Sequence, residues 1–225
     1  MGSISENLET LRERIKRAVV KAGGEVREIT LVAVSKGRTV EAIREAVLAG
    51  QDVFGENRAQ ELREKLECLE LDLEWHFIGH LQRNKVNMVV GRTALIHSVD
   101  SRRLLESIAA RAGELETTQD ILLQVNTSGE QSKYGMEEGD TAAILESALA
   151  LPTVRVRGLM TIAPLGTAVE ARKCFVRLRE LRDTLTQDYV PQGLEVLSMG
   201  MTQDFEVALE EGANMVRIGT AIFAA

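Results

Sequence analysis

Hydrophobic residues along the chain follow two alternating patterns. Short runs rich in valine, isoleucine and leucine, typical of buried strands, alternate with longer segments of helical periodicity. The short runs lie at 29–36, 52–57, 74–80, 94–100, 120–126, 154–160, 194–200 and 214–219. The helical segments lie at 5–22, ahead of the first run, and then at 39–49, 57–69, 84–90, 102–112, 138–150, 169–188 and 204–211. The chain thus predicts eight strands, each separated from the next by a helix.

Strict alternation of strand and helix favours parallel strands joined by right-handed crossovers. Eight such units predict an α/β fold in which the sheet closes into a single (β/α)8 TIM barrel. The alternative is an open doubly wound sheet, which predicts a GxGxxG turn after the first strand, whereas this chain has VAVSKGRT there. No linker or low-complexity tract divides the sequence. We therefore expect one domain over residues 1–225, with an extra N-terminal helix.

Composition narrows the class of protein. The net charge of −7 disfavours binding to nucleic acid or to an acidic membrane, because both need a basic surface. No apolar run reaches the roughly 18 residues of a membrane span, and the N-terminus lacks the basic and apolar segments of a secretion signal. Cys68 and Cys174 lie far apart without metal-binding spacing, and we interpret both as reduced, partly buried thiols. These features predict a soluble, cytoplasmic protein.

Lys36 ends the first apolar run. In a (β/α)8 barrel the C-terminal ends of the strands form the functional face, so this lysine is expected at the barrel mouth. Partial desolvation there would favour a neutral amine, the form that condenses with an aldehyde to give an imine. Alternatively, Lys36 is a structural residue that pairs with Glu56 or Asp100. Its position alone leaves both interpretations open.

The loops after the seventh and eighth runs have the composition of a phosphate site. Barrels of this kind often bind phosphate there, where backbone N–H groups and a short helix face the anion. Glycine allows close backbone approach, and hydroxyl side chains donate hydrogen bonds. The candidate residues are Ser198, Met199, Gly200, Thr202, Gly219 and Thr220. An imine-forming lysine together with a phosphate site is the combination that pyridoxal 5′-phosphate (PLP) requires.

Arg217 lies within the eighth run and is expected to point into the barrel. It either forms an ion pair inside the barrel or faces the pyridine nitrogen of the cofactor. An arginine in the second position keeps that nitrogen unprotonated and weakens the ring as an electron sink. Such a site suits a carrier or a racemase better than a transaminase.

The three histidines do not predict a metal site. His76 and His80 have the spacing of a metal pair on a helix, but their segment has the pattern of a strand and turn and lacks an HExxH motif. His97 is predicted to be a core residue. Asp100 or Ser101 is predicted to cap the helix that follows the fourth run. No nucleophile–base arrangement can be assembled, so no catalytic residue is assigned.

The motifs, taken in order, resemble the pyridoxal phosphate homeostasis proteins of the YggS/PROSC type from end to end. The matching blocks are VAVSK (32–36), FGENRAQE (54–61), WHFIGHLQRNK (75–85), SVDS (98–101), QVNTSGEQSKYG (124–135), GLMTIAP (158–164) and LSMGMTQDFEVALEEGANMVRIGTAIF (197–223). So many blocks in one order are highly specific. The chain departs from the family pattern after the lysine, where it has Gly37-Arg38-Thr39, and at Thr202 and Ala224.

The resemblance implies a fold-type-III PLP barrel, like the N-terminal domain of alanine racemase. It implies that Lys36 forms the internal aldimine with PLP and that Arg217 faces the pyridine nitrogen. It further implies that Asn57 lies beside the cofactor and that Lys133 assists transfer or offers a second attachment point. The phosphate would be surrounded by Ser198, Gly200, Thr202, Gly219 and Thr220.

The family is regarded as regulating the vitamin B6 pool and amino/keto-acid metabolism, with no established reaction. Fold-type-III racemases use a C-terminal β domain that contributes an acid–base group, but only six residues follow the eighth run here, so we expect no such domain. The main interpretation is a monomeric PLP carrier that serves apo-PLP enzymes. The alternatives are a weak one-domain racemase and a PLP-liganded interaction module that uses the charged helices at 57–69 and 169–188.

Overall fold

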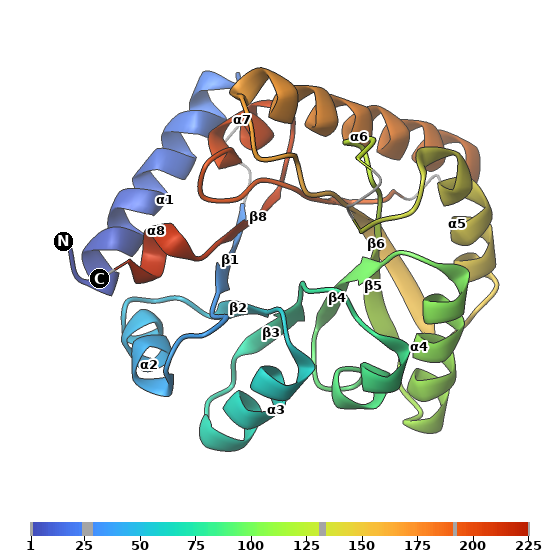
Figure 1. Ribbon diagram of the computed structural model, residues 1–225, viewed down its shortest axis with the longest axis horizontal. Helices are drawn as coiled ribbons and strands as arrows, with labels where there is room; N and C mark the ends of the chain where they lie inside the picture. The colour runs from blue at the N-terminus through green and yellow to red at the C-terminus, as the bar shows by residue number, and fades with distance from the viewer. Residues whose placement is uncertain (1, 24–28, 131–133, 191–192, 225) are drawn as a thin grey trace.

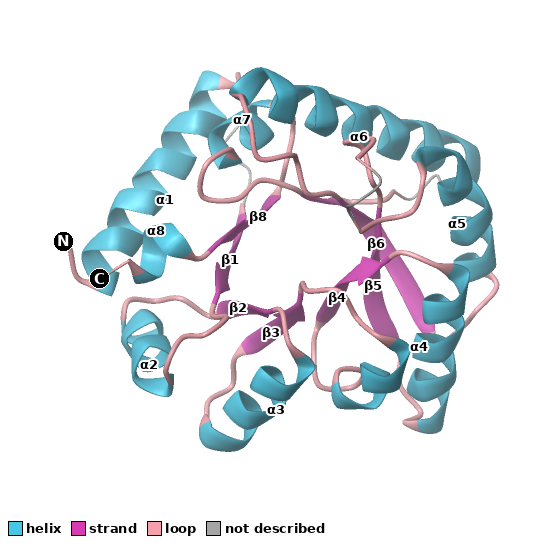
Figure 2. Cartoon of the chain, viewed as in Figure 1, coloured by secondary structure: helices cyan, strands magenta, loops and turns pink. Residues whose placement is uncertain are grey.

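The eight predicted strands form a closed barrel. The computed structural model describes residues 2–23, 29–130, 134–190 and 193–224. The strands are β1 (Thr30–Val34), β2 (Val53–Glu56), β3 (Glu74–Phe77), β4 (Leu95–Val99), β5 (Gln119–Gln124), β6 (Val154–Met160), β7 (Val196–Ser198) and β8 (Met215–Ile218). They pair in chain order, all in parallel, and β8 pairs with β1 to complete the ring, which Figure 2 shows in magenta. The prediction of a (β/α)8 barrel rather than an open sheet is confirmed.

Helices surround the barrel (Figure 1). They are α1 (Ile4–Lys21), α2 (Val40–Leu48), α3 (Ala59–Cys68), α4 (Arg102–Glu114), α5 (Thr141–Leu149), α6 (Ala168–Tyr189), α7 (Phe205–Glu210) and α8 (Thr220–Phe223). Two 3-10 segments, η1 (Arg83–Met88) and η2 (Glu138–Asp140), complete the elements. The helix predicted at 84–90 is therefore the tighter η1, and the residues that follow β8 form α8, which the sequence pattern did not predict. Among the described residues, no helix combines the length and hydropathy needed to cross a bilayer.

The extra N-terminal helix is confirmed as α1. Ser3 and Glu6 form a capping box that satisfies its first N–H groups. Its buried face, which includes Leu8 and Leu11, packs on the barrel side that α2, α7 and α8 flank. The Asn7 side chain donates hydrogen bonds to the carbonyls of Ile222 and Ala224, so the two ends of the chain lie together (Figure 1). This helix completes the ring of helices where α8 is short.

The barrel interior has an apolar and a polar part. Val32, Leu95, Leu122, Met160 and Met215, from five different strands, form an apolar cluster separate from the main core between strands and helices. Four of the buried polar side chains, His76, His97, Ser198 and Arg217, come from β3, β4, β7 and β8 and are hydrogen-bonded to one another. The interior is a packed core, as expected for this fold.

Two local predictions hold only in part. Ser101, one of the two residues predicted to cap α4, is its N-cap, but its side chain makes no capping bond. Asp100, the other, lies 3.4 Å from His80 Nδ1 through Oδ2. Cys68, the last residue of α3, is exposed rather than partly buried, whereas Cys174 of α6 is buried; neither forms a disulfide. Neither correction changes the fold.

Candidate functional site

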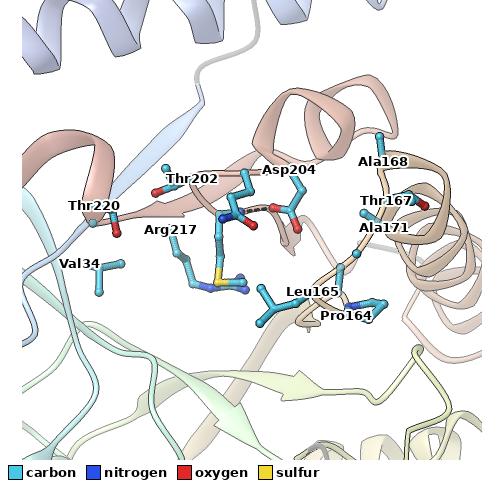
Figure 3. Close-up of a pocket in the computed structure, with 15 residues that line it drawn as sticks. Val34, Pro164, Leu165, Thr167, Ala168, Ala171, Thr202, Asp204, Arg217 and Thr220 are labelled. Carbon is cyan, nitrogen blue, oxygen red and sulfur yellow. Dashed lines mark hydrogen bonds between the residues drawn. The ribbon is translucent and has the colours of Figure 1, made fainter. Parts of the chain in front are cut away.

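A cavity of about 290 Å³ opens at the C-terminal ends of β6, β7 and β8 (Figure 3). Four of the residues predicted for cofactor binding line it: Thr202, Arg217, Gly219 and Thr220. The other lining residues come from the end of β1, from the loops after β6 and β7 and from the start of α6. They are Val34, Ala163, Pro164, Leu165, Gly166, Thr167, Ala168, Ala171, Met201, Gln203 and Asp204. The cavity therefore lies between the two loops predicted to hold phosphate.

Arg217 provides the positive charge of this cavity. Its Nη1 donates a hydrogen bond of 2.7 Å to Ser198 Oγ, and its Nη2 donates one of 2.9 Å to the Thr161 carbonyl. Burial lowers the pKa of Arg217 to about 10, and the nearby Asp204 carboxylate opposes that shift. The guanidinium remains charged at neutral pH. Among the described residues it has no carboxylate within ion-pair distance, so the alternative of an ion pair inside the barrel is not formed.

The loop after β7 lines the cavity and contains N–H groups without an acceptor among the described residues. Asp204 and Phe205 donate their N–H groups to the Met201 carbonyl, and Asp204 Oδ1 accepts a 2.6 Å bond from the Met201 N–H. In the described chain, the intervening N–H groups of Thr202 and Gln203 find no acceptor. Burial raises the pKa of Asp204, although the Met201 N–H favours its charged form. Asp204, the N-cap of α7, thus holds this turn through the Met201 N–H, a role that sequence reasoning missed.

The loop after β8 is similar. Gly219 is the N-cap of α8, and its carbonyl accepts bonds from Ile222 and Phe223. A Cβ at Gly219 would lie only 3.0 Å from the Val34 carbonyl oxygen, so β8 passes close to the end of β1 at this residue. The first N–H groups of a helix have no acceptor within it, which leaves the Thr220 N–H and hydroxyl beside the cavity.

Three other predicted residues lie beneath the cavity lining. Ser198 and Met199 are fully buried, and the Met199 N–H bonds to the Met215 carbonyl. Gly200 has φ = +95°, and a Cβ there would lie 2.6 Å from the Ala208 Cβ. These residues shape the turn that carries Thr202, and none of them lines the cavity.

Lys36 lies in an exposed turn two residues beyond Val34, because β1 ends earlier than the apolar run. The expectation of a partly desolvated lysine is therefore wrong. The proposed pairing of Lys36 with Glu56 is also wrong, because Glu56 forms a buried ion pair with Lys65 of α3. Asp100, the other suggested partner, pairs with His80.

The backbone around Lys36 is held on both sides. Lys65 Nζ donates a 2.6 Å hydrogen bond to the Ser35 carbonyl, and Ser35 Oγ donates one of 2.7 Å to Glu56 Oε1. On the other side, the Gly37 N–H donates a 2.8 Å bond to Glu61 Oε2, which lowers the pKa of that carboxyl. The Lys36 side chain is thus free to move on a backbone that is fixed.

Two predicted residues lie elsewhere. Asn57 follows β2 and is half-buried beside a smaller hollow lined by His80 and Lys85. Its Oδ1 is buried without a hydrogen-bond partner in the described structure, which is costly for an amide oxygen. Lys133 lies outside the described residues. No group of three or more potential metal ligands occurs in the described part of the chain.

The buried histidines form a hydrogen-bonded chain that sequence reasoning did not predict. Glu74 Oε1 lies 2.8 Å from His76 Nε2, and His76 Nδ1 lies 3.0 Å from His97 Nε2. His97 Nδ1 lies 2.9 Å from Ser198 Oγ, the atom that accepts from Arg217. His97 is a core residue, as predicted. The alternation of β3 and β4 could have shown that both histidines point inward, but not that they meet.

Comparison with known proteins identifies the class. All 225 residues match the family model for the N-terminal domain of alanine racemase. An alanine racemase of Clostridium difficile shares the fold, with a TM-score of 0.73 at 16% identity, and the match covers 98% of this chain and 57% of that one. The chain therefore belongs to the alanine racemase N-terminal domain family.

Some members of this family are similar to the chain over nearly their full length and at much higher identity. A pyridoxal phosphate homeostasis protein of Aquifex aeolicus is 47% identical, with 97% of this chain and 96% of the relative covered. One of Pseudomonas aeruginosa is 42% identical, with 100% and 96% covered. The structure of PipY from Synechococcus elongatus with PLP bound has a TM-score of 0.87 at 40% identity, covering 99% of this chain and all of that one.

Proposed function

We propose that this chain binds PLP at the C-terminal mouth of its barrel, with Lys36 as the imine-forming residue, and that it serves PLP homeostasis. The observation that carries the proposal is a buried, charged Arg217 in the lining of a cavity that is also lined by two loops with hydroxyl side chains and with N–H groups that have no acceptor among the described residues. A dianionic phosphate requires such a donor set. The similarity to PipY, whose structure has PLP bound, supports the same ligand.

The donors divide into two groups. Thr202, Gly219 and Thr220 would hold the phosphate through hydroxyls and backbone N–H groups, and Arg217 would face the pyridine nitrogen. When bound, PLP supplies an aldehyde for an imine and a ring that acts as an electron sink. Because Arg217 is a charged donor, the nitrogen it faces would act as an acceptor and carry no proton. Ser198, Met199 and Gly200 would support this site from beneath.

Other predicted contacts remain proposals. Asn57 offers an unpartnered amide oxygen, which a contact near the cofactor would satisfy. Lys133 is retained as a second attachment point or an aid to transfer. The role we propose is that of a cytoplasmic, monomeric carrier that supplies apo-PLP enzymes.

The cavity favours a carrier over an enzyme. Racemisation needs an acid and a base on opposite faces of the cofactor. Among the described residues, the ionisable groups that line the cavity are Arg217 and Asp204, and Asp204 is bound by the Met201 N–H. Leu165, also in the lining, is 88% exposed, and Lys36 is exposed as well, so the mouth is open to loading and release.

The phosphate assignment predicts a ligand-dependent effect of Thr220→Val. Losing one hydrogen bond to a charged phosphate costs about 1.5–3 kcal/mol, so the dissociation constant of PLP should rise roughly tenfold or more. Pyridoxal, which lacks the phosphate, should bind the variant and the wild type alike. Spectroscopic titration with both ligands measures this difference. Thr202→Val provides a second variant, and Thr117→Val, on an exposed turn, provides the control. Equal weakening of PLP and pyridoxal would contradict the assignment.

The carrier role predicts cofactor transfer without turnover. PLP-loaded protein should activate an apo-PLP enzyme in the presence of a trap that removes free PLP, whereas Lys36→Ala protein should not. The same preparation should exchange no α-hydrogen of L-alanine with deuterium in heavy water over a day, as followed by proton NMR. Steady exchange would instead establish the weak racemase.

A further inference from the structure

A continuous line of hydrogen bonds crosses the barrel interior. It begins at Glu74, the first residue of β3, whose side chain is 52% exposed, and ends at Arg217 in the cavity lining. Between them lie His76, His97 and Ser198, which are buried and come from β3, β4 and β7. Each link is 2.7 to 3.0 Å long. The line therefore joins the N-terminal end of the barrel to the proposed cofactor site.

The chemistry of the two ends determines where each hydrogen lies. The His76 bond lowers the pKa of Glu74, so this carboxylate is ionised and only accepts, and His76 Nε2 must donate to it. A neutral His76 then has Nδ1 as an acceptor, so the partner nitrogen, His97 Nε2, must donate. Burial, with the neighbouring His76 and Arg217, holds the pKa of His97 well below its ordinary value, so this ring is neutral.

The same reasoning continues to the cavity. Because His97 Nε2 carries the hydrogen, His97 Nδ1 is an acceptor, and the Ser198 hydroxyl must donate to it. The remaining lone pairs of Ser198 then face Arg217, whose Nη1–H donates to them. Every hydrogen along the line therefore points from Arg217 towards Glu74. The Ser198 hydrogen is used by His97 and is not available to a phosphate.

The reverse arrangement satisfies the groups less well. If His76 carried two hydrogens, His97 Nε2 would accept and His97 Nδ1 would donate to Ser198. Ser198 Oγ would then receive hydrogens from both His97 and Arg217, and its own hydrogen would have no acceptor in the described structure. An unsatisfied buried hydroxyl costs about 1–3 kcal/mol.

We propose that Glu74, His76 and His97 are positioning residues for Arg217: they orient the Ser198 hydroxyl so that its oxygen holds the guanidinium in place at the cofactor site. The second anchor, the Thr161 carbonyl, holds the other terminal nitrogen. The guanidinium plane is thus fixed at two points, and its remaining N–H groups are left for the cavity. The role given to Arg217 rests on the proposed function, but the direction of the hydrogen bonds along the line does not.

The direction of the hydrogen bonds along the line can be measured in protein without PLP, from which ring nitrogen of each histidine carries hydrogen. The sequence contains only three histidines, and a His80→Gln variant removes the one that is not part of the line of hydrogen bonds. Nitrogen-15 spectra of histidine-labelled protein should then show His76 and His97 both neutral, with hydrogen on Nε2 and none on Nδ1. A hydrogen on His97 Nδ1, or a doubly protonated His76 above pH 7, would overturn the proposal.

Removing the carboxylate tests whether it directs the chain. Glu74→Ala should allow both histidines to populate mixed tautomers, while the matched exposed variant Glu70→Ala should leave the spectrum unchanged. In PLP-loaded protein, Glu74→Ala should also change the cofactor absorbance and weaken PLP binding by about 2- to 30-fold, the range of couplings between distant sites. Melting temperature should change little, because Glu74 is half exposed. Unchanged tautomers and unchanged absorbance in Glu74→Ala would remove its assigned role.

These outcomes separate the two proposals. If PLP fails to bind wild-type protein, the proposed function is wrong, whatever the histidine spectrum shows. If PLP binds but the histidine tautomers are reversed, the proposed function is retained, and the proposal that Glu74, His76 and His97 position Arg217 is wrong. His97→Leu, which removes the hydrogen bonds to His76 and to Ser198, should weaken PLP binding more than Glu74→Ala does. His97→Gln, whose amide can accept from Ser198, should recover part of that loss.

Discussion

Replacing Lys36 with alanine is expected to abolish covalent capture of PLP. In the wild-type protein, borohydride should reduce the imine and leave a phosphopyridoxyl group on the peptide that contains Lys36, which mass spectrometry of a digest detects. The variant should yield no label on the peptide that contains position 36 and should lose the visible absorbance band of the imine, and any label on Lys133, the proposed second attachment point, should be minor. Because Lys36 is exposed, its loss should change the free energy of unfolding by no more than about 0.5 kcal/mol.

A second lysine provides the control. Lys16 is exposed on α1 and does not line the cavity, and Lys16→Ala should keep both the labelled peptide and the absorbance band. PLP should still bind Lys36→Ala non-covalently through the phosphate loops, although more weakly. Full labelling of another lysine in Lys36→Ala, with the absorbance band retained, would contradict the assignment of Lys36 as the imine-forming residue.

Breaking the buried ion pair between Glu56 and Lys65 should lower the free energy of unfolding more than any of the other single substitutions. Lys65→Ala leaves Glu56 fully buried without its cation, and loss of one partner of a buried pair costs about 3–5 kcal/mol. The variant also removes the hydrogen bond from Lys65 to the Ser35 carbonyl, next to Lys36. Urea denaturation should show a lower midpoint with an unchanged slope, because the folded structure and its exposed surface are otherwise retained.

Two comparisons isolate the buried charge. Arg63→Ala removes an exposed pair with Glu67 on the same helix and should cost less than about 1 kcal/mol. The double variant Lys65→Met with Glu56→Leu removes both buried charges and should recover at least half of the loss. A double variant no more stable than Lys65→Ala would mean that the uncompensated charge is not the main cost.

Most of the fold could be predicted because it depends on local periodicity. Strand and helix segments differ in the spacing of their apolar residues, and eight alternating units admit few arrangements. The errors were local. The segment at 84–90 is apolar enough for a helix but forms the 3-10 helix η1, and the residues after β8 were too few to show a helical period although they form α8.

The candidate site could be predicted only in part. Arg217, Thr202, Gly219 and Thr220 were found because their loops occupy known positions in a barrel, and they line one cavity. Asp204 and the loop after β6 were missed because they contribute through backbone shape and capping, which leave little trace in residue type. Lys36 was placed at the correct strand end, but its exposure could not be read from the apolar run before it.

The sequence by itself determined the barrel, the family and the lysine at the end of β1, because each depends on residue order within a short segment. Only the tertiary structure decided which charged groups meet. It paired Glu56 with Lys65 rather than Lys36, and it joined His76, His97 and Ser198 into a line that ends at Arg217. Those contacts join residues up to 101 positions apart. Such pairings arise from strand register and barrel closure, which no local pattern of hydrophobic and polar residues encodes.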